Sequence, residues 1–175
     1  MTCATSVRAV PGLAACVLAA WSGGASAQIA GCQLGPTPEG RQVLRCGDFK
    51  AVLEPGTDVR AVDANRDGAP DALQLANRGV LVDYEAPGRR GFQILTPHAI
   101  AAVRGTTWVV SVEGGRTSVF VVGGQVTVTR AAAGHRVLLR AGEGVDVDGG
   151  GSGPLRVASW PRERVAALLA RFGRR

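Results

Sequence analysis

The chain has 175 residues, of which 20 are Lys or Arg and 14 are Asp or Glu, giving a formal net charge of +6. Its basic residues are scattered, because no run is longer than the pairs Arg89-Arg90 and Arg174-Arg175 and the single lysine is Lys50. A nucleic-acid-binding surface calls for clustered basic residues, so we expect no nucleic-acid partner. No segment reaches 18 continuous apolar residues, which argues against stable membrane insertion.

The first 27 residues have the organisation of a secretory signal peptide. Arg8 precedes an apolar run from Ala9 to Trp21, and small residues follow up to Ala27. We therefore predict cleavage after Ala27, which leaves 148 of the 175 residues (175 minus 27) as one exported domain.

Residues 28–47 form a segment rich in glycine and proline that contains two cysteines, Cys32 and Cys46. Because Cys3 and Cys16 lie in the signal peptide, the remaining pair is predicted to form one disulfide in the oxidising compartment. An alternative is that Ile29-Ala30-Gly31-Cys32 is a lipobox, which would make Cys32 a lipid anchor. The lipobox lies beyond the apolar run and would leave Cys46 unpaired, so we favour the disulfide.

Residues 48–149 are short β-prone runs separated by turn residues, and no helical pattern intervenes. In residues 125–130 the apolar Val126 and Val128 alternate with threonines, and Val145 and Val147 alternate with aspartates, so the valines should face the core. The pattern predicts an all-β fold, a compact antiparallel β-roll or sandwich. The main predicted strands are residues 49–54, 79–84, 106–112, 117–122, 125–130, 135–140 and 144–149.

The spacing of apolar residues changes near the C-terminus from a strand-like to a helical period. Residues 150–159 form a glycine-rich hinge and strand, and residues 160–173 place Val165, Leu168, Leu169 and Phe172 at helical spacing. We predict a short amphipathic helix that packs on its own β-domain, with a partner or a membrane surface as the alternative contact.

A loop at 63–71 has the pattern of a calcium site. Asp63, Asn65, Asp67 and Asp71 supply side-chain oxygens, the carbonyl of Ala69 could add another, and Gly68 permits a sharp bend. Calcium prefers six to eight oxygen ligands, so the spacing predicts a structural Ca²⁺ site resembling the loops of VCBS and thrombospondin type 3 repeats. The alternative is an aspartate-rich turn held by local hydrogen bonds.

The sequence does not favour an enzyme. His98 and His135 are the two histidines, 37 residues apart, and no nucleophile motif accompanies them. Arg104 follows His98 closely, and we interpret it as a structural arginine that pairs with a buried carboxylate or with strand-edge carbonyls, with a partner-binding arginine as the alternative.

The segment from Leu81 to Gly149 resembles a FecR domain, through "TPHAIAAVRGTTWVV", the "VFVVGGQVTV" hairpin and the closing "VLLRAGEGVDV". The motif residues are Thr96, Pro97, Val103, Arg104, Gly105 and Thr106, which we expect to form a strand-to-strand corner. The resemblance implies a periplasmic β-domain for sensing or signalling. Membrane regulators of this family begin with a cytoplasmic helical segment and a transmembrane helix, whereas a signal peptide is predicted here, which argues against direct anti-sigma activity.

Two functions follow from these observations. The first is a non-enzymatic periplasmic module that docks to an envelope or membrane signalling protein. The alternative is a structural envelope protein that binds peptidoglycan or polysaccharide. Trp108 and Trp160 distinguish them, because exposed rings would favour stacking on glycans and buried rings would favour the signalling module.

Overall fold

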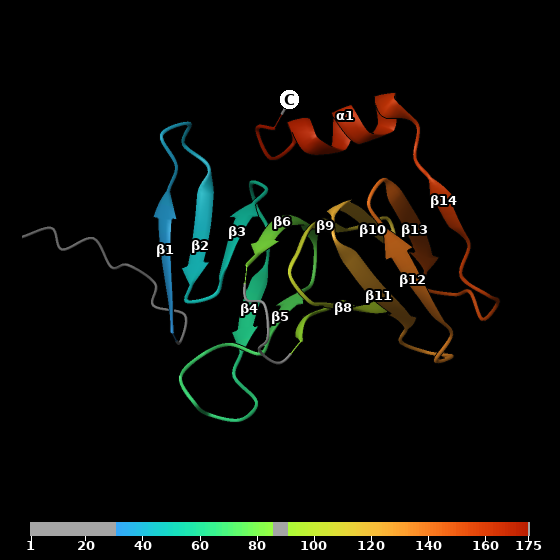
Figure 1. Cartoon of the computed structure of the whole chain (residues 1–175), viewed down its shortest axis with the longest axis horizontal. Coiled ribbons are helices and arrows are strands. Elements are labelled where there is room, and N and C mark those ends of the chain that lie inside the picture. The colour runs from blue at the N-terminus through green and yellow to red at the C-terminus, as the bar shows by residue number, and fades with distance from the viewer. Residues whose placement is uncertain (1–30, 86–90, 175) are drawn as a thin grey trace, which may run out of the picture.

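The computed structural model describes residues 31–85 and 91–174, so the predicted signal peptide at 1–27 lies outside the described residues. The chain forms two β-sheets that face each other, with one helix on the outside (Figure 1). The larger sheet has eight strands in the order β1 (Cys32–Pro36), β2 (Gln42–Cys46), β3 (Phe49–Leu53), β6 (Arg78–Tyr84), β9 (Thr106–Glu113), β10 (Arg116–Gly123), β13 (Glu143–Asp148) and β14 (Val157–Ser159).

The smaller sheet has six strands in the order β12 (Arg136–Arg140), β11 (Gln125–Arg130), β8 (Ala99–Val103), β7 (Phe92–Leu95), β5 (Ala72–Leu75) and β4 (Val59–Val62). All strand pairs are antiparallel except β5 and β7, which run parallel. The predicted all-β sandwich is confirmed, with this one difference. It arises because the chain leaves β5 for β6 in the other sheet before it returns as β7.

The main core lies between the two sheets. Trp108 of β9 is fully buried there, and Phe92 of β7 packs edge-on against its ring with centroids 6.2 Å apart. The predicted alternation is confirmed, because Val126, Val128 and Val147 are 0% exposed and Val145 is 1% exposed. Each of these valines faces the opposite sheet, as the pleat of a half-buried strand requires.

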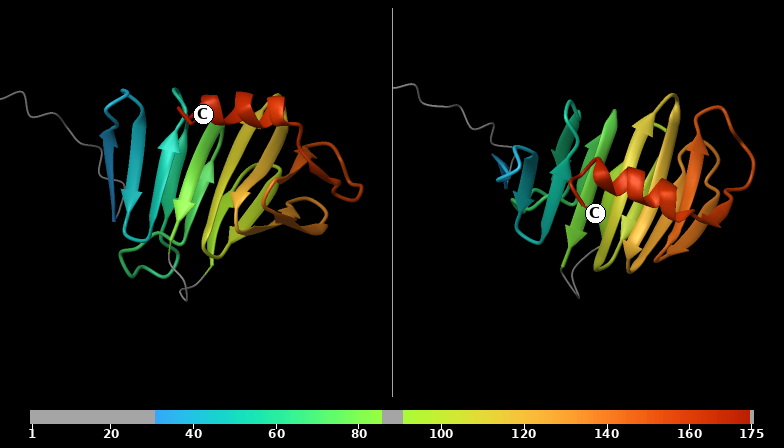
Figure 2. Two further views of the ribbon diagram at one scale, coloured as in Figure 1. Left: turned by 45° about the horizontal axis from the view of Figure 1, so that its top comes forward. Right: turned by 90° about the horizontal axis from the view of Figure 1, so that it is seen from above.

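Helix α1 (Arg162–Ala170) lies across the outer face of the larger sheet, as Figure 2 shows from two directions. It buries Leu168, and Phe172 just beyond its end, against a second apolar cluster. The sheet side of this cluster consists of Val43, Val52, Leu81, Val109 and Phe120. The C-terminal helix therefore packs on its own domain, which is the arrangement that the helical spacing favoured.

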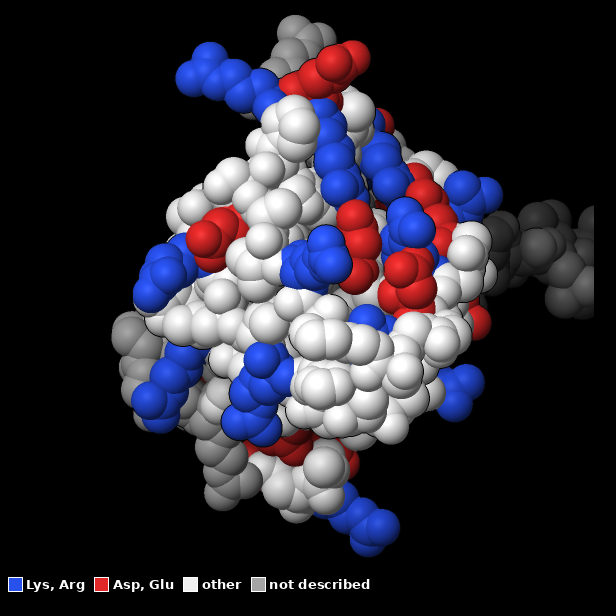
Figure 3. Space-filling model, turned by 90° about the vertical axis from the view of Figure 1, so that its right-hand side faces the viewer, with Lys and Arg blue, Asp and Glu red and all other residues white. Residues whose placement is uncertain are grey.

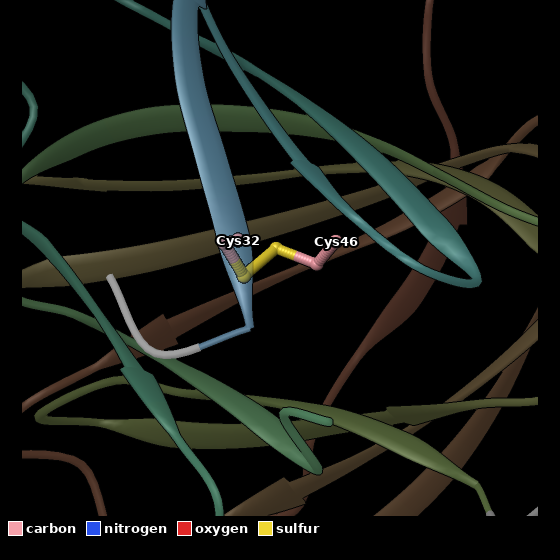
Figure 4. Close-up of a disulfide and its surroundings, with 2 residues drawn as sticks. All are labelled: Cys32 and Cys46. Atoms are coloured by element: carbon pink, nitrogen blue, oxygen red, sulfur yellow. A yellow bond between two sulfur atoms is a disulfide. The ribbon is translucent and has the colours of Figure 1, made fainter. Parts of the chain in front are cut away.

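The N-terminal segment is an integral part of the larger sheet. No strand was predicted in residues 28–47, but β1 and β2 form an antiparallel hairpin, and β2 pairs with β3. The disulfide joins Cys32 to Cys46, which are directly opposite each other in this hairpin (Figure 4). Both cysteines are buried in the main core, so the disulfide ties the edge strand to the rest of the sheet.

We predict that replacing both Cys32 and Cys46 by serine lowers the free energy of unfolding by about 3 kcal/mol. The disulfide closes a loop with a sequence separation of 14, and the lost chain entropy of the unfolded state sets this magnitude. Denaturant titration of the chain from Gln28 onward, with and without reductant, measures the effect. Two free thiols in the denatured, unreduced protein would contradict the pairing.

Candidate functional site

The calcium-like loop connects β4 to β5 and is organised by its own acidic side chains. The Asp63 carboxylate accepts hydrogen bonds from the backbone N–H groups of Asp67 (3.2 Å) and Gly68 (2.9 Å). One Asp71 carboxylate oxygen, Oδ2, accepts from Ala64 and Asn65 at 3.0 and 3.3 Å. Within residues 31–85 and 91–174 no three His, Cys, Asp or Glu side chains are grouped as a metal site.

The remaining loop side chains also bond locally. The Asn65 side chain donates to Asp67 Oδ2 at 2.9 Å, and Asp67 Oδ1 accepts from the backbone N–H of Ala69 at 3.0 Å. Gly68 has a φ of +87°, as the predicted sharp bend requires. The loop contacts the disulfide hairpin, because a Cβ on Gly31 would lie 2.2 Å from the Gly68 carbonyl oxygen. It therefore helps to join the two sheets.

The motif from Thr96 to Thr106 forms a corner between the two sheets. The Thr96 hydroxyl closes the turn from β7 to β8 by bonding both the carbonyl and the N–H of Ala99 (2.8 and 2.9 Å). Val103 ends β8 in the smaller sheet, and Thr106 begins β9 in the larger one. Gly105 takes a φ of +58° at this crossing, and Thr106 is buried and donates to the Gln125 carbonyl at 3.0 Å. Pro97 is exposed beside this turn.

His98 and Arg104, which lie in the same motif, have very different surroundings. The imidazole of His98 is half-buried, lies over Gly149 and contacts the hydroxyl of buried Thr117 at 3.1 Å. Arg104 is exposed and has no side-chain hydrogen bond or ion pair within the described residues, so the expectation of a buried structural arginine was wrong. The physical reason is the alternation of β8: Ala99, Ala101 and Val103 are buried, so the next side chain falls on the solvent side.

Among the described residues the buried arginine is Arg130, at the end of β11, which we did not single out from the sequence. It is 6% exposed and donates from Nη1 to the carbonyls of Asp148 (2.8 Å) and Gly151 (2.7 Å). The alternation of β11 could have identified it, because Val126 and Val128 face inward and residue 130 follows on the same face.

Neither tryptophan in the described residues has a ring face exposed to solvent. Trp108 is 0% exposed in the main core, and Trp160 is partly buried. The Trp160 ring stacks on Phe120 with centroids 5.2 Å apart, and the Arg164 guanidinium carbon lies 3.4 Å from the ring centroid. Trp108 therefore cannot contact a partner while the domain is folded.

The C-terminal segment is positioned by two glycines in the larger sheet. A Cβ on Gly79 would lie 2.9 Å from Phe172 Cζ, and a Cβ on Gly144 would lie 2.3 Å from Trp160 Cε2. Both distances are shorter than van der Waals contact allows. Each glycine thus leaves space on the outer face of the sheet for one aromatic side chain of the C-terminal segment.

Arginine side chains tie the same segment to the sheet. Arg171 donates from Nε and Nη2 to the two carboxylate oxygens of Glu54 (3.0 and 2.6 Å), and Nη2 also reaches Glu113 at 2.5 Å. The hydrogen bond to Glu54 raises the pKa of Arg171 against the effect of burial, with help from the charges of both glutamates. Arg174 bonds Asp83, also at 2.5 Å. These carboxylates lie on β6 and at the ends of β3 and β9. The ion pairs of Arg171 and Arg174, which we call the clamp, therefore span the middle of the larger sheet.

Asp146 of β13 holds the beginning of the helix. Burial alone would raise the pKa of Asp146, but hydrogen bonds from Arg164 and Ser118, together with the charges of Arg164 and Arg116, outweigh it and lower the pKa below its ordinary value. Arg164 Nη2 lies 2.7 and 2.9 Å from the two carboxylate oxygens. The ionised carboxylate therefore favours the docked helix at neutral pH.

The family described as FecR protein matches residues 38–127, which are more than half of the chain, and the chain belongs to this family. Two crystal structures of a candidate anti-sigma factor from Parabacteroides distasonis ATCC 8503, at 2.50 and 1.65 Å resolution, have a similar fold. Each has a TM-score of 0.55 and 18% sequence identity, with 82% of this chain covered. The chain spans 62% and 63% of those two structures. A search of curated proteins gives no significant match.

No helix in the described part of the chain is long and apolar enough to cross a membrane.

We predict that Gly79→Ala loosens the C-terminal helix and lowers stability by about 1–3 kcal/mol, because the added methyl group must displace the ring of Phe172. Amide hydrogen exchange in α1 should become faster while exchange in β11 stays unchanged. Gly35→Ala is the matched control, because a Cβ on this strand glycine meets nothing within 4 Å. Equal protection of α1 in the two variants would contradict the role assigned to Gly79.

Proposed function

We propose that this protein is a non-enzymatic periplasmic signalling module that docks to an envelope or membrane signalling protein. The observation that carries the proposal is membership of the FecR family over residues 38–127. Two further observations support it: the fold shared with a candidate anti-sigma factor, and a disulfide, which is typical of proteins outside the cytoplasm.

The most suitable docking surface is the end of the sandwich where β12 and β14 are the last strands of their sheets. Edge strands present unpaired N–H and C=O groups to which an extended segment of a partner can add. The exposed large apolar side chains of the described residues also lie on the strands of this end, at Val122, Leu138 and Val157. Helix α1 is a poorer docking element, because its apolar side already faces the larger sheet.

Binding of peptidoglycan or polysaccharide is less well supported. Stacking on sugars needs an exposed aromatic face. Every aromatic side chain in residues 31–85 and 91–174 is buried except Trp160, whose ring is stacked on Phe120 and covered by Arg164.

We predict that a photo-crosslinking amino acid at Leu138 or Val157 captures one membrane signalling protein when the full chain is expressed in its native host. The same amino acid at Gln74, an exposed position on β5 near the opposite edge of the smaller sheet, is the control. Leu138→Arg should abolish the crosslink from position 157, because it places a charge in the apolar edge. Crosslinks to cell-wall material alone, or equal yields from position 74, would contradict the proposed docking.

We further propose that the loop at 63–71 binds a structural Ca²⁺. Asp63, Asn65, Asp67 and Asp71 lie in one tight turn, and a carboxylate that accepts backbone hydrogen bonds keeps lone pairs available for a cation. The ion would strengthen the contact between this loop and the disulfide hairpin.

Calcium is expected to raise the thermal midpoint relative to chelator, with a stabilisation of about 2.7 kcal/mol at a hundredfold excess over Kd. Asp67→Ala should remove the calcium-dependent part of the shift. Magnesium at the same concentration is the control for ionic strength. Identical melts in calcium and chelator, for the wild type and the variant alike, would refute the site.

A further inference from the structure

A cleft of about 420 Å³ lies where β13 and β14 meet the beginning of α1. Three arginines, two aspartates and the edge of Trp160 line it, together with backbone of the neighbouring turns; the charged residues are Arg130, Arg156, Arg164, Asp146 and Asp148. Figure 3 shows the side of the molecule that carries this end of the sandwich, with basic and acidic side chains interleaved over its upper part. The cleft shares Ala158 and Ser159 of β14 with the edge proposed for docking, but its charged residues take no part in that proposal.

The buried guanidinium of Arg130 has no carboxylate partner among the described residues. Its two hydrogen bonds go from Nη1 to backbone carbonyls, and its Nε is buried without a partner. Arg130 lines the cleft, and its Nη2 makes no hydrogen bond to any described residue. A desolvated guanidinium is costly unless it is paired, so the site lacks a negative group.

Neither carboxylate of the cleft forms an ion pair with Arg130. Asp146 is bonded to Arg164 and, at 2.6 Å, to the hydroxyl of Ser118. Asp148 is paired at 2.6 Å with Arg116, a residue that does not line the cleft. With these pairs formed, Arg130 and Arg156 are the cations of the lining that have no carboxylate partner among the described residues.

The beginning of α1 adds a second, independent attraction for an anion. The helix starts after Pro161, which has no side chain that can cap it, and no side-chain cap is formed. The N–H groups of the first turn are therefore uncapped and partly positive beside the cleft, and the charge of Glu163 in the same turn offsets part of this attraction. Oxyanions are commonly held where such a turn and arginine side chains converge.

We propose that this cleft binds an oxyanion, a carboxylate or phosphate group of a small soluble molecule, between Arg130, Arg156 and the first turn of α1. The guanidinium groups would donate paired hydrogen bonds to the oxygens of this group, and Trp160 would contact the carbon skeleton that carries it. This inference does not depend on the proposed docking, which uses the strand edges.

The test is a titration of the mature protein with inorganic phosphate and, separately, with acetate, at constant ionic strength set by chloride. Two-dimensional amide and indole NMR follows the signals of Trp160, Gly151 and the first turn of α1. We expect saturable shifts confined to these groups for at least one of the anions. Arg156→Gln should weaken binding about tenfold, because it removes one charge-assisted pair from an exposed position that the fold does not need.

Arg60→Gln on β4 is the matched control, since Arg60 is also exposed but lies on the edge strand farthest from β12 in the smaller sheet. Arg130→Lys keeps the charge and removes the paired donors, and it should weaken binding while the β-sheet spectrum is retained. Phosphate preferred over acetate would identify the ligand as a phosphate ester, and the reverse a carboxylic acid. The proposal is overturned if neither anion gives saturable shifts, or if Arg60→Gln weakens binding as much as Arg156→Gln.

Discussion

The structure depends on one constraint: the central strands of the larger sheet are apolar on both faces. In β6, Val80 and Val82 face the smaller sheet, whereas Leu81 faces outward, and all three are fully buried. In β9, Val110 and Val109 divide in the same way. A sheet of this kind needs two covers, because an exposed apolar strip of this length would favour aggregation. The smaller sheet is one cover, and α1 is the other.

The cover formed by α1 depends on the fit of individual side chains as well as on apolar burial. Gly79 and Gly144 interrupt strands at positions where a β-branched residue would pair better, so they weaken the sheet locally. Phe172 and Trp160 fill the two spaces that result. The register of the C-terminal segment is thereby fixed at two points. The clamp from Arg171 to Glu54 lies next to the first of them, because Glu54 also borders the space above Gly79.

The sequence predicted the longer strands and the helix, because alternation and helical spacing are local signals. It did not predict β4, β5, β7 or β8 of the smaller sheet, which are only four or five residues long. It did not predict the N-terminal hairpin, since residues 32–46 contain glycine and proline and their strands depend on pairing with β3. The parallel pairing of β5 and β7 was also inaccessible, because it follows from a crossover between sheets. Arg104 was expected to be structural because motif spacing identifies a corner, but motif spacing does not show which side chains point inward.

The continuous apolar runs of β6 and β9 did indicate, from the sequence alone, that both faces of these strands are buried. A strand with one solvated face alternates, as β11 does, whereas a run such as residues 80–82 indicates burial on both sides. That pattern predicts a second cover, and the amphipathic C-terminus is the segment free to provide it. The same reasoning explains why the cleft and the docked helix are linked. Arg164 and Trp160 line the cleft only when α1 is seated, so an anion bound there would bind the docked state alone and stabilise it by mass action.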